Sequence, residues 1–417
     1  MSIFSDKFDQ LKKADKAVKS PKYLQEVMGI GRIAENGIFE VGKGIYSRTY
    51  RTYRFLDINY VTAGAEEQMR ILKQYCKTVN AIDIYFLITI FNRNKNMQDF
   101  REHVLFQEKG DGFNWLRGSY NQIIEKRIVD GRQGIEQEKL LTVCVERKSY
   151  EQAKAFFATF EATLKQNFGE LGSCIEELNA EERLRVLFNF YRIGEEEQFS
   201  FDFRQALKKG GDPKNDISPG YMQFYPGYFE TERKKCRALF IKKYPSSLSD
   251  TFLNEITSLP VHSITTICIV PVPKELANKV LQKKYLGIEN DILKQQRVRN
   301  KNNDFSTEIS YAKRTEKKEI EEIMDDVREN DQCLFFVGVT IILMAESKKE
   351  LESVCETVET IGKRNSCTID THYLKQREAL NTALPIGVRQ VETMRTLLTL
   401  SLIHISEPTR LRRISYA

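Results

Sequence analysis

Hydrophobic and polar positions along the chain follow two periods, which predict strands and helices in alternation. Residues 3–27 are charged and predict a leading helix. Arg32 to Val41 alternates between apolar and polar residues around Asn36-Gly37. Asn-Gly is the strongest short hairpin signal, because both residues tolerate positive φ. A hairpin is therefore expected there, followed by one or two strands over 45–61.

Apolar residues at three- and four-residue spacing predict helices between the later strands. The first of these helices begins near Ala65 and places Met69, Leu72, Cys76 and Val79 on one face. The alternation then predicts strands over 82–91, 140–145, 237–241, 264–270, 333–344 and 368–374, and helices over 153–164, 249–258, 274–299, 315–330 and 351–361. This order predicts an α+β fold of ferredoxin-like strand–helix units, with largely antiparallel sheets and helices on one face.

A cluster of Gly, Pro, Asn and Asp interrupts the apolar period between Lys208 and Asp216. It predicts an N-terminal α+β domain over 1–207, a linker over 208–216 and a second α+β domain over 217–399. The charged stretch from Arg297 to Asp304 is expected to be a loop between two helices, or a small basic contact surface.

Residues 400–417 are expected to be non-native. Leu400 to Arg410 can be back-translated into a transposase adapter of short-read sequencing libraries, and Ile414 to Ala417 fits the outer part of the same adapter. A basic C-terminal tail is the ordinary alternative. On the adapter hypothesis the tail is excluded from fold reasoning, and the chain is a truncated fragment.

The charge balance is mildly basic, with 64 Lys and Arg against 58 Asp and Glu, or +6. Without three Arg and one Glu of the tail it becomes 61 − 57 = +4. Such a balance is too weak to predict nucleic-acid binding without a localised patch. The longest apolar run, Cys333 to Ala345, is well short of the ~20 residues that a membrane-spanning helix needs. A cytoplasmic protein is expected, with docking to a membrane complex left open.

The eight cysteines form no C-x-x-C pair, and several lie in apolar runs, as Cys144 does. They are expected to be reduced and buried. His103, His262 and His372 have no cysteine at ligand spacing, so no zinc site is predicted.

Two glycine motifs resemble phosphate-binding loops but lack the required context. Gly37 to Gly44 nearly matches G-x-x-x-x-G-K-[ST], yet Gly44 replaces the hydroxyl residue and a strand follows where a helix should begin. Gly29 to Ala34 matches G-x-G-x-x-[GA], but a helical stretch precedes it and it opens a strand. A hairpin with a glycine bulge is the better interpretation of the first motif.

His262, Asp370 and His372 suggest catalysis only superficially, because no nucleophile signature accompanies them. Trp115 is expected to be a packing anchor rather than a binding platform. No catalytic, cofactor-binding or metal-binding residue is therefore predicted.

Three stretches carry a resemblance to a known family. They are the hairpin with Tyr53 to Tyr60 and the helix containing Glu66 to Gln68, the block from Gly112 to Asn189, and the closing Gln376 to Gly387, which runs into Met394 to Leu397. In this order the chain resembles the N-terminal half of the VirB/TraE-type ATPases of conjugative type IV secretion systems, in the form found in Gram-positive mobile elements.

The resemblance implies an α+β region before a RecA-like motor domain, whose phosphate-binding loop has no counterpart in this chain. No cofactor is therefore expected for the fragment, whereas ATP and magnesium are expected for the intact parent. The implied role is docking to inner-membrane secretion components at the cytoplasmic face, in a homo-oligomer when intact.

Two alternatives stay open. One is a free-standing α+β scaffold or regulatory protein. The other is nucleic-acid binding through the basic stretch from Arg297 to Lys318, although direct binding is not favoured. Truncation is also expected to leave the closing helix near Ala379 without its packing partner and to expose an apolar patch.

Overall fold

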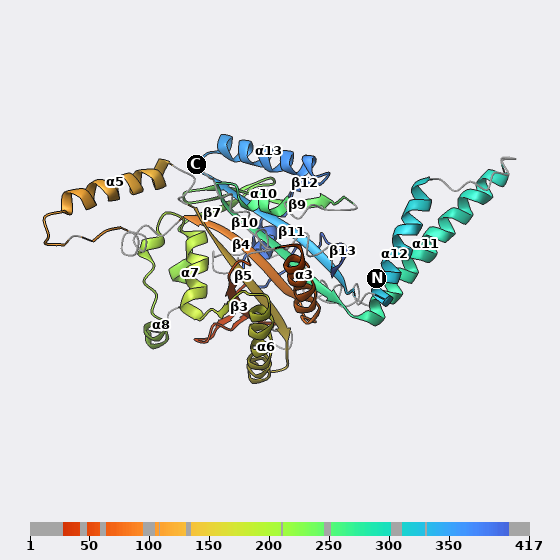
Figure 1. Cartoon of the computed structure of the whole chain (residues 1–417), viewed down its shortest axis with the longest axis horizontal. Helices are drawn as coiled ribbons and strands as arrows, with labels where there is room; N and C mark the ends of the chain where they lie inside the picture. The colour runs from red at the N-terminus through yellow and green to blue at the C-terminus, as the bar shows by residue number, and fades with distance from the viewer. Residues whose placement is uncertain are drawn as a thin grey trace.

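The computed structural model describes residues 28–41, 48–58, 64–94, 105–107, 109–130, 135–209, 212–245, 252–301, 311–329 and 332–399. The predicted helix over 3–27 and the expected adapter tail over 400–417 lie outside these ranges. The described residues combine helices with a mostly antiparallel sheet, which confirms the α+β class (Figure 1).

Two units of the same topology build the fold. The first contains β3 (Arg48–Phe55), α3 (Ala65–Asn80), β4 (Phe86–Asn94), β5 (Ile135–Glu146), α6 (Tyr150–Glu170) and β6 (Ile175–Glu177). The second contains β9 (Lys235–Lys243), α10 (Phe252–Thr257), β10 (His262–Val272), β11 (Leu334–Ala345), α13 (Lys348–Arg364) and β12 (Thr368–Thr371). Their strand orders are β6–β3–β5–β4 and β12–β9–β11–β10, all antiparallel, which is the ferredoxin-like arrangement.

The likeness extends beyond the two units. A hairpin precedes each one, β1 (Arg32–Ile33) with β2 (Phe39–Val41) and β7 (Met222–Phe224) with β8 (Phe229–Thr231). A helix follows each one, α7 (Ala180–Tyr191) and α14 (Gln376–Ala383). The molecule is therefore an internal structural duplication.

One continuous sheet joins the two units, because β4 pairs with β10 from Asn92 and Ser263 to Phe86 and Ile269. A last strand, β13 (Arg395–Leu398), pairs with β11. The predicted linker over 208–216 falls between the duplicated units, after the 3-10 helix η3 (Glu196–Gln198), and overlaps the end of α8 (Phe203–Lys209) and most of α9 (Lys214–Ile217). The predicted boundary thus separates two units of one sheet.

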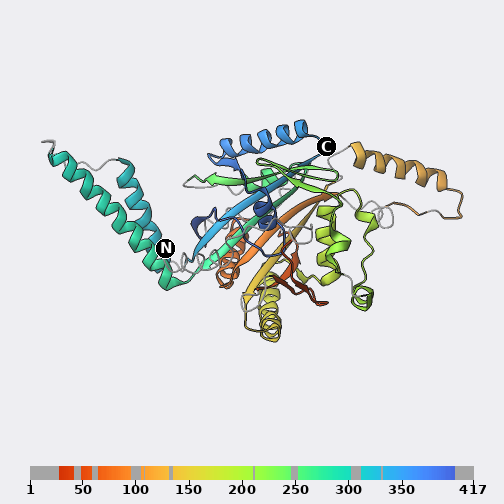
Figure 2. The ribbon, with the colours of Figure 1, turned by 180° about the vertical axis from the view of Figure 1, so that it is seen from behind.

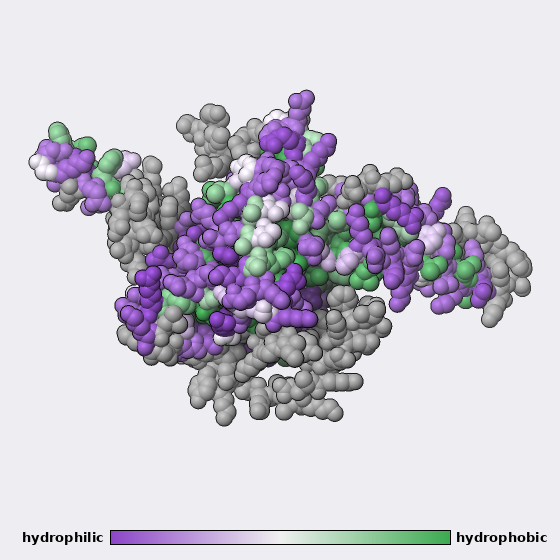
Figure 3. Space-filling view, turned by 90° about the horizontal axis from the view of Figure 1, so that it is seen from below, coloured by the Kyte–Doolittle hydropathy of each residue, from purple (hydrophilic) through white to green (hydrophobic). Residues whose placement is uncertain are grey.

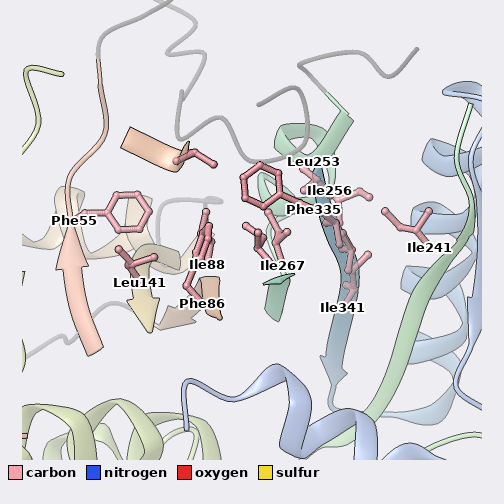
Figure 4. Packing of buried hydrophobic residues seen from close by; sticks show 14 of the residues in the cluster. Phe55, Phe86, Ile88, Leu141, Ile241, Leu253, Ile256, Ile267, Phe335 and Ile341 are labelled. Atoms are coloured by element: carbon pink, nitrogen blue, oxygen red, sulfur yellow. The ribbon is translucent and has the colours of Figure 1, made fainter. Parts of the chain in front are cut away.

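Helices cover both faces of the sheet, so the expectation of helices on one face is wrong. On one face α3, α6, α10 and α13 enclose the larger core, where Phe86, Ile267 and Ile341 from neighbouring strands meet (Figure 4). On the other face α7 and α14 enclose the second core. Each strand contributes alternate residues to the two cores, which explains why the central strands are apolar at nearly every position.

Equivalent serines begin equivalent helices in the two units. The Ser149 side chain accepts a hydrogen bond from the Gln152 N–H at the start of α6, and Ser347 accepts from Glu350 at the start of α13. Such caps satisfy backbone donors that have no partner within the helix. Both helices were predicted correctly from their apolar spacing. In α3, by contrast, the buried stripe is Ile71, Tyr75 and Val79, and Met69 is 52% exposed.

The predicted hairpin is confirmed, although its turn differs. Gly37 donates to the Ala34 carbonyl, and Ala34 donates to the Ile38 carbonyl, which gives a three-residue loop. Gly37 alone has positive φ, +78°, as in a turn closed by a glycine bulge. A Cβ at Gly37 would lie 1.9 Å from the Leu178 carbonyl oxygen, so this position also needs glycine for space.

Each unit carries a projecting arm between its second and third strands. The first arm contains α5 (Asn114–Asp130), and the second is a hairpin of α11 (Lys274–Lys301) and α12 (Tyr311–Glu329). The arms extend from opposite ends of the molecule in both ribbon views (Figures 1 and 2). The duplicated sheet thus presents two arms at equivalent positions.

Candidate functional site

The closing segment, residues 376–391, is built into the second core. The Gln376 side chain accepts a hydrogen bond from the Ala238 N–H at 2.9 Å and donates to the His372 carbonyl at 2.8 Å. Ala379, Leu380 and Ile386 are fully buried. The expectation that the closing helix would lack a packing partner is therefore wrong, because β9, β10 and β11 already cover it.

Arg183 fastens the closing segment to the first unit. Its guanidinium donates to the carbonyls of Gly37 at 2.8 Å, Tyr50 at 3.1 Å and Pro385 at 2.8 Å, and lies over the Phe39 ring. Burial lowers the pKa of Arg183 to about 9. Three backbone carbonyls take the place of a carboxylate, so a single cation links the hairpin, β3 and the closing segment.

The Leu384-Pro385-Ile386-Gly387 stretch needs its glycine. Gly387 has φ +82°, and a Cβ there would lie 1.7 Å from the Tyr50 ring. The Thr266 hydroxyl donates to the Ala383 carbonyl at 2.5 Å, next to this crossing. Residues that carry the family resemblance in this segment therefore have a structural use in this chain.

The two glycine motifs fall in the first hairpin. Gly37 closes the β1–β2 turn, and Lys43 and Gly44 lie outside the described residues. Gly29 has φ +65° and precedes β1, so a strand follows where a dinucleotide site would have a helix.

His262 and His372 lie apart. His262 begins β10, whereas His372 follows β12, three strands away and about 14 Å at roughly 4.8 Å per strand. Asp370 pairs with Lys242, and the His372 ring stacks on Phe240 at 4.4 Å. Burial lowers the pKa of both histidines to about 4. The structure does not bring the three residues together as a catalytic group.

Glu177 on β6 and Glu161 on α6 form a carboxylate pair with shifted pKa values. Donating a hydrogen bond to Glu161 raises the pKa of Glu177. Burial acts to raise the pKa of Glu161, but the hydrogen bonds that it accepts from Glu177 and Lys165 outweigh burial and lower it. Arg51 contacts both carboxylates, at 3.6 Å for Glu161 and 2.5 Å for Glu177. Structural ion networks also shift pKa values, and this one ties β6 and α6 to β3.

The cysteines are free thiols. Burial raises the pKa of Cys144 to about 12 and that of Cys268 to about 11. Cys174 is exposed, against the expectation of burial. Within the described ranges no three His, Cys, Asp or Glu side chains are grouped so as to hold a metal ion.

A shallow apolar depression of about 230 Å³ lies between the end of α3 and α6. Ile82, Phe156, Phe160 and Leu164 line it, and Asp83 is the one ionisable residue among its lining residues. A depression with one carboxylate lacks the converging polar groups of a catalytic pocket.

The first arm is rich in exposed apolar side chains. Trp115 is 69% exposed, so the interpretation of Trp115 as a packing anchor is wrong. Five more large apolar side chains of this arm are about half or more exposed: Phe106, Phe113, Leu116, Tyr120 and Ile123. In Figure 3 apolar groups lie on the surface of this arm, at the left. Patches of this kind mark binding surfaces.

The second arm pairs its two helices. Ile288 and Ile292 of α11 pack against Ile320 of α12 in a small core of their own. Part of the basic stretch from Arg297 to Lys318 is neutralised here, because Lys313 contacts Asp291 and Lys317 contacts Glu289. The basic patch is thus smaller than the sequence suggests.

Sequence reasoning missed the internal duplication. Ser173-Cys174 before β6 and Ser366-Cys367 before β12 occupy equivalent places, as do the capping residues Ser149 and Ser347. A search for self-similarity at this spacing could have found them.

Comparisons with known proteins give no assignment: no protein-family model matches the chain, and no curated protein matches it either. Among the described helices, none is both long enough and apolar enough to cross a membrane.

Proposed function

We propose that this chain is the assembly and docking region of a conjugative type IV secretion ATPase of the VirB type. The observation that carries the proposal is the closing segment from Gln376 to Gly387. This segment bears the family resemblance, and Gln376, Pro385 and Gly387 are each held by named contacts. A segment fixed to both units could hold a following motor domain at a constant orientation.

The arms provide the docking part of the proposal. Two projections at opposite ends of one rigid sheet suit a protein that positions partners, and peripheral association with the membrane complex would use these surfaces. The parent would be an ATPase that binds ATP and magnesium in its motor, whereas this region would act through contacts.

A free-standing scaffold is the second candidate. The burial of Ala379, Leu380 and Ile386 favours it, because the closing helix already has its packing partners within the described fold. The two candidates differ in whether a motor follows Thr399 in the natural gene.

Sequencing the natural locus tests the proposal. A phosphate-binding loop is expected within about two hundred residues after Thr399, the length of one domain. A frame that continues without such a loop would overturn the ATPase proposal in favour of the scaffold. As a functional test, excess of this chain in a donor cell should lower conjugation frequency at least about tenfold, by occupying assembly contacts.

A further inference from the structure

The two arms occupy equivalent places in the duplicated fold, yet one lacks a partner. In the second arm the apolar stripe of α11 packs on α12 through Ile288, Ile292 and Ile320. In the described part of the first arm, α5 has no such helix, and its apolar residues are exposed.

Three of the exposed apolar residues of α5 form a stripe. Leu116, Tyr120 and Ile123 follow i, i+4, i+7 spacing and so share a helix face, with Trp115 at its edge. The Phe106 ring packs beside Tyr120 at 5.2 Å. This is the pattern by which one helix packs on another.

The flank of α5 next to the stripe is already occupied. The Asn121 side chain accepts from the Phe106 N–H and donates to the Phe106 carbonyl, both at 3.0 Å, and Arg117 pairs with Asp111. These bonds hold the segment before α5 against the helix and leave the stripe facing outward. In the described residues of the arm, the segment before α5 is thus bound to the helix while the stripe stays exposed.

Charge and area are compatible with a second copy of the arm as the partner. Residues 105–130 contain four basic and four acidic residues, so two copies of the arm meet without net repulsion. The six exposed side chains of the arm, three on the stripe and three outside it, offer on the order of 600 Å². Two arms together reach about 1,200 Å², the lower limit for a specific interface.

We propose that α5 of one molecule pairs with α5 of a second copy, so that the two arms form the helix pair that α11 and α12 form within one chain. A two-fold axis near Tyr120 would place Leu116 of each copy against Ile123 of the other. Such a contact uses the same surface on both molecules and closes as a dimer. The inference rests on the proposed assembly role and names its partner.

Trp115 is the single tryptophan of the chain, so its fluorescence reports on this arm alone. Sedimentation and tryptophan emission are measured together over a concentration series of the whole chain. A dimer is expected in the micromolar range, with emission moving to the blue as it forms. The double variant Leu116→Glu with Ile123→Glu should stay monomeric, with its dissociation constant raised at least a hundredfold.

Leu286→Glu with Leu293→Glu on α11 is the matched control, because these leucines are 56% and 49% exposed on the other arm. It should dimerise as the parent does. A dimer that persists in the α5 variant, or a parent chain monomeric to about 100 µM, above the micromolar range, would overturn the pairing. So would a monomer whose Trp115 emission shifts only with neutral phosphatidylcholine vesicles, which would make α5 a lipid-binding arm.

Failure of the α5 pairing can be told apart from failure of the ATPase proposal. A gene that encodes a motor together with a monomeric chain would overturn the pairing alone. A gene without a motor together with an α5 dimer would overturn the ATPase proposal alone.

Discussion

The two units of the duplicated sheet share a topology and differ in their arms. Both insert an arm between the second and third strands of a ferredoxin-like unit. The arm of the second unit folds on itself through Ile288, Ile292 and Ile320. The arm of the first unit leaves Leu116, Tyr120 and Ile123 exposed.

The difference shows which regions bury their apolar side chains within the chain and which leave them exposed. The sheet, its two helix layers and the closing segment bury their apolar side chains within one chain. Among the described residues of the α5 arm, the helix is formed but its large apolar side chains stay exposed. Most of the stability of helices in proteins comes from tertiary packing of an apolar face, so α5 needs such packing. We therefore infer that a partner covers the exposed stripe of α5.

Gly387 and Gly112 both have positive φ, and replacing each with alanine should give the largest difference in lost stability. Gly387→Ala places a methyl group against the buried Tyr50 ring and should cost more than about 4 kcal/mol or prevent folding. Gly112→Ala, at φ +77° with no atom within 4 Å, should cost about 1–2 kcal/mol. Urea unfolding measures both. Equal losses would mean that the closing segment is not tightly packed.

Arg183→Met should have the next largest effect. It removes the donor shared by the carbonyls of Gly37, Tyr50 and Pro385, which stay buried. The expected loss is about 3 kcal/mol, because unsatisfied buried carbonyls keep their desolvation cost. Arg185→Met, on the same helix but at an exposed position, is the control and should change stability by less than about 0.5 kcal/mol. A loss for Arg183→Met as small as the control's would contradict the link between the units.

The core of the second arm should respond to truncation, and its outer face should not. Ile288→Ala leaves a cavity between α11 and α12. It should lower the stability of this helix pair by about 2–3 kcal/mol. Leu286 lies on the opposite face of α11 and is 56% exposed, so Leu286→Ala should leave the stability of the arm nearly unchanged. Limited proteolysis of the arm distinguishes them. If both variants are cut at the rate of the parent, the second arm is not held by this core.

Acid should lower the free energy of unfolding of the duplicated sheet, because burial lowers the pKa of His262 and His372. Burial lowers the pKa of His372 to about 4, whereas the unfolded chain binds the proton near its ordinary pKa of 6.5. Stability should therefore fall as pH drops from 6.5 toward 4, by about 2 kcal/mol at pH 5 from His372. His372→Phe keeps the stacking on Phe240 and should reduce this slope, leaving the part due to His262. An unchanged slope would show that His372 is not the titrating group.

Apolar spacing was enough to predict most helices and strands, because local periodicity decides which face an element buries. It located α6, α11, α12 and α13 and the strands between them. It placed helices on one face only, because α7 had not been recognised. Most of the 12 residues of α7 are buried, and the charged Arg183 among them interrupts the apolar period of the buried face.

The candidate surfaces could be predicted only in part. The exposure of Trp115 depends on how far α5 projects from the sheet, which no local pattern encodes. The roles of Gln376 and Gly387 depend on contacts with Ala238 and Tyr50, more than a hundred residues earlier in the chain. Such long-range contacts follow from the duplicated topology, which the sequence analysis did not detect.

Hydrogen exchange at two protein concentrations measures whether a second copy covers α5 while the closing segment stays buried. Amides of α14 in the closing segment should exchange only through global opening at both concentrations. Amides of α5 should exchange quickly in dilute protein and become protected at high concentration, as a second copy covers the stripe. Protection of α5 equal to that of α14 in the dilute monomer would contradict the account, as would α5 amides that stay unprotected at every concentration.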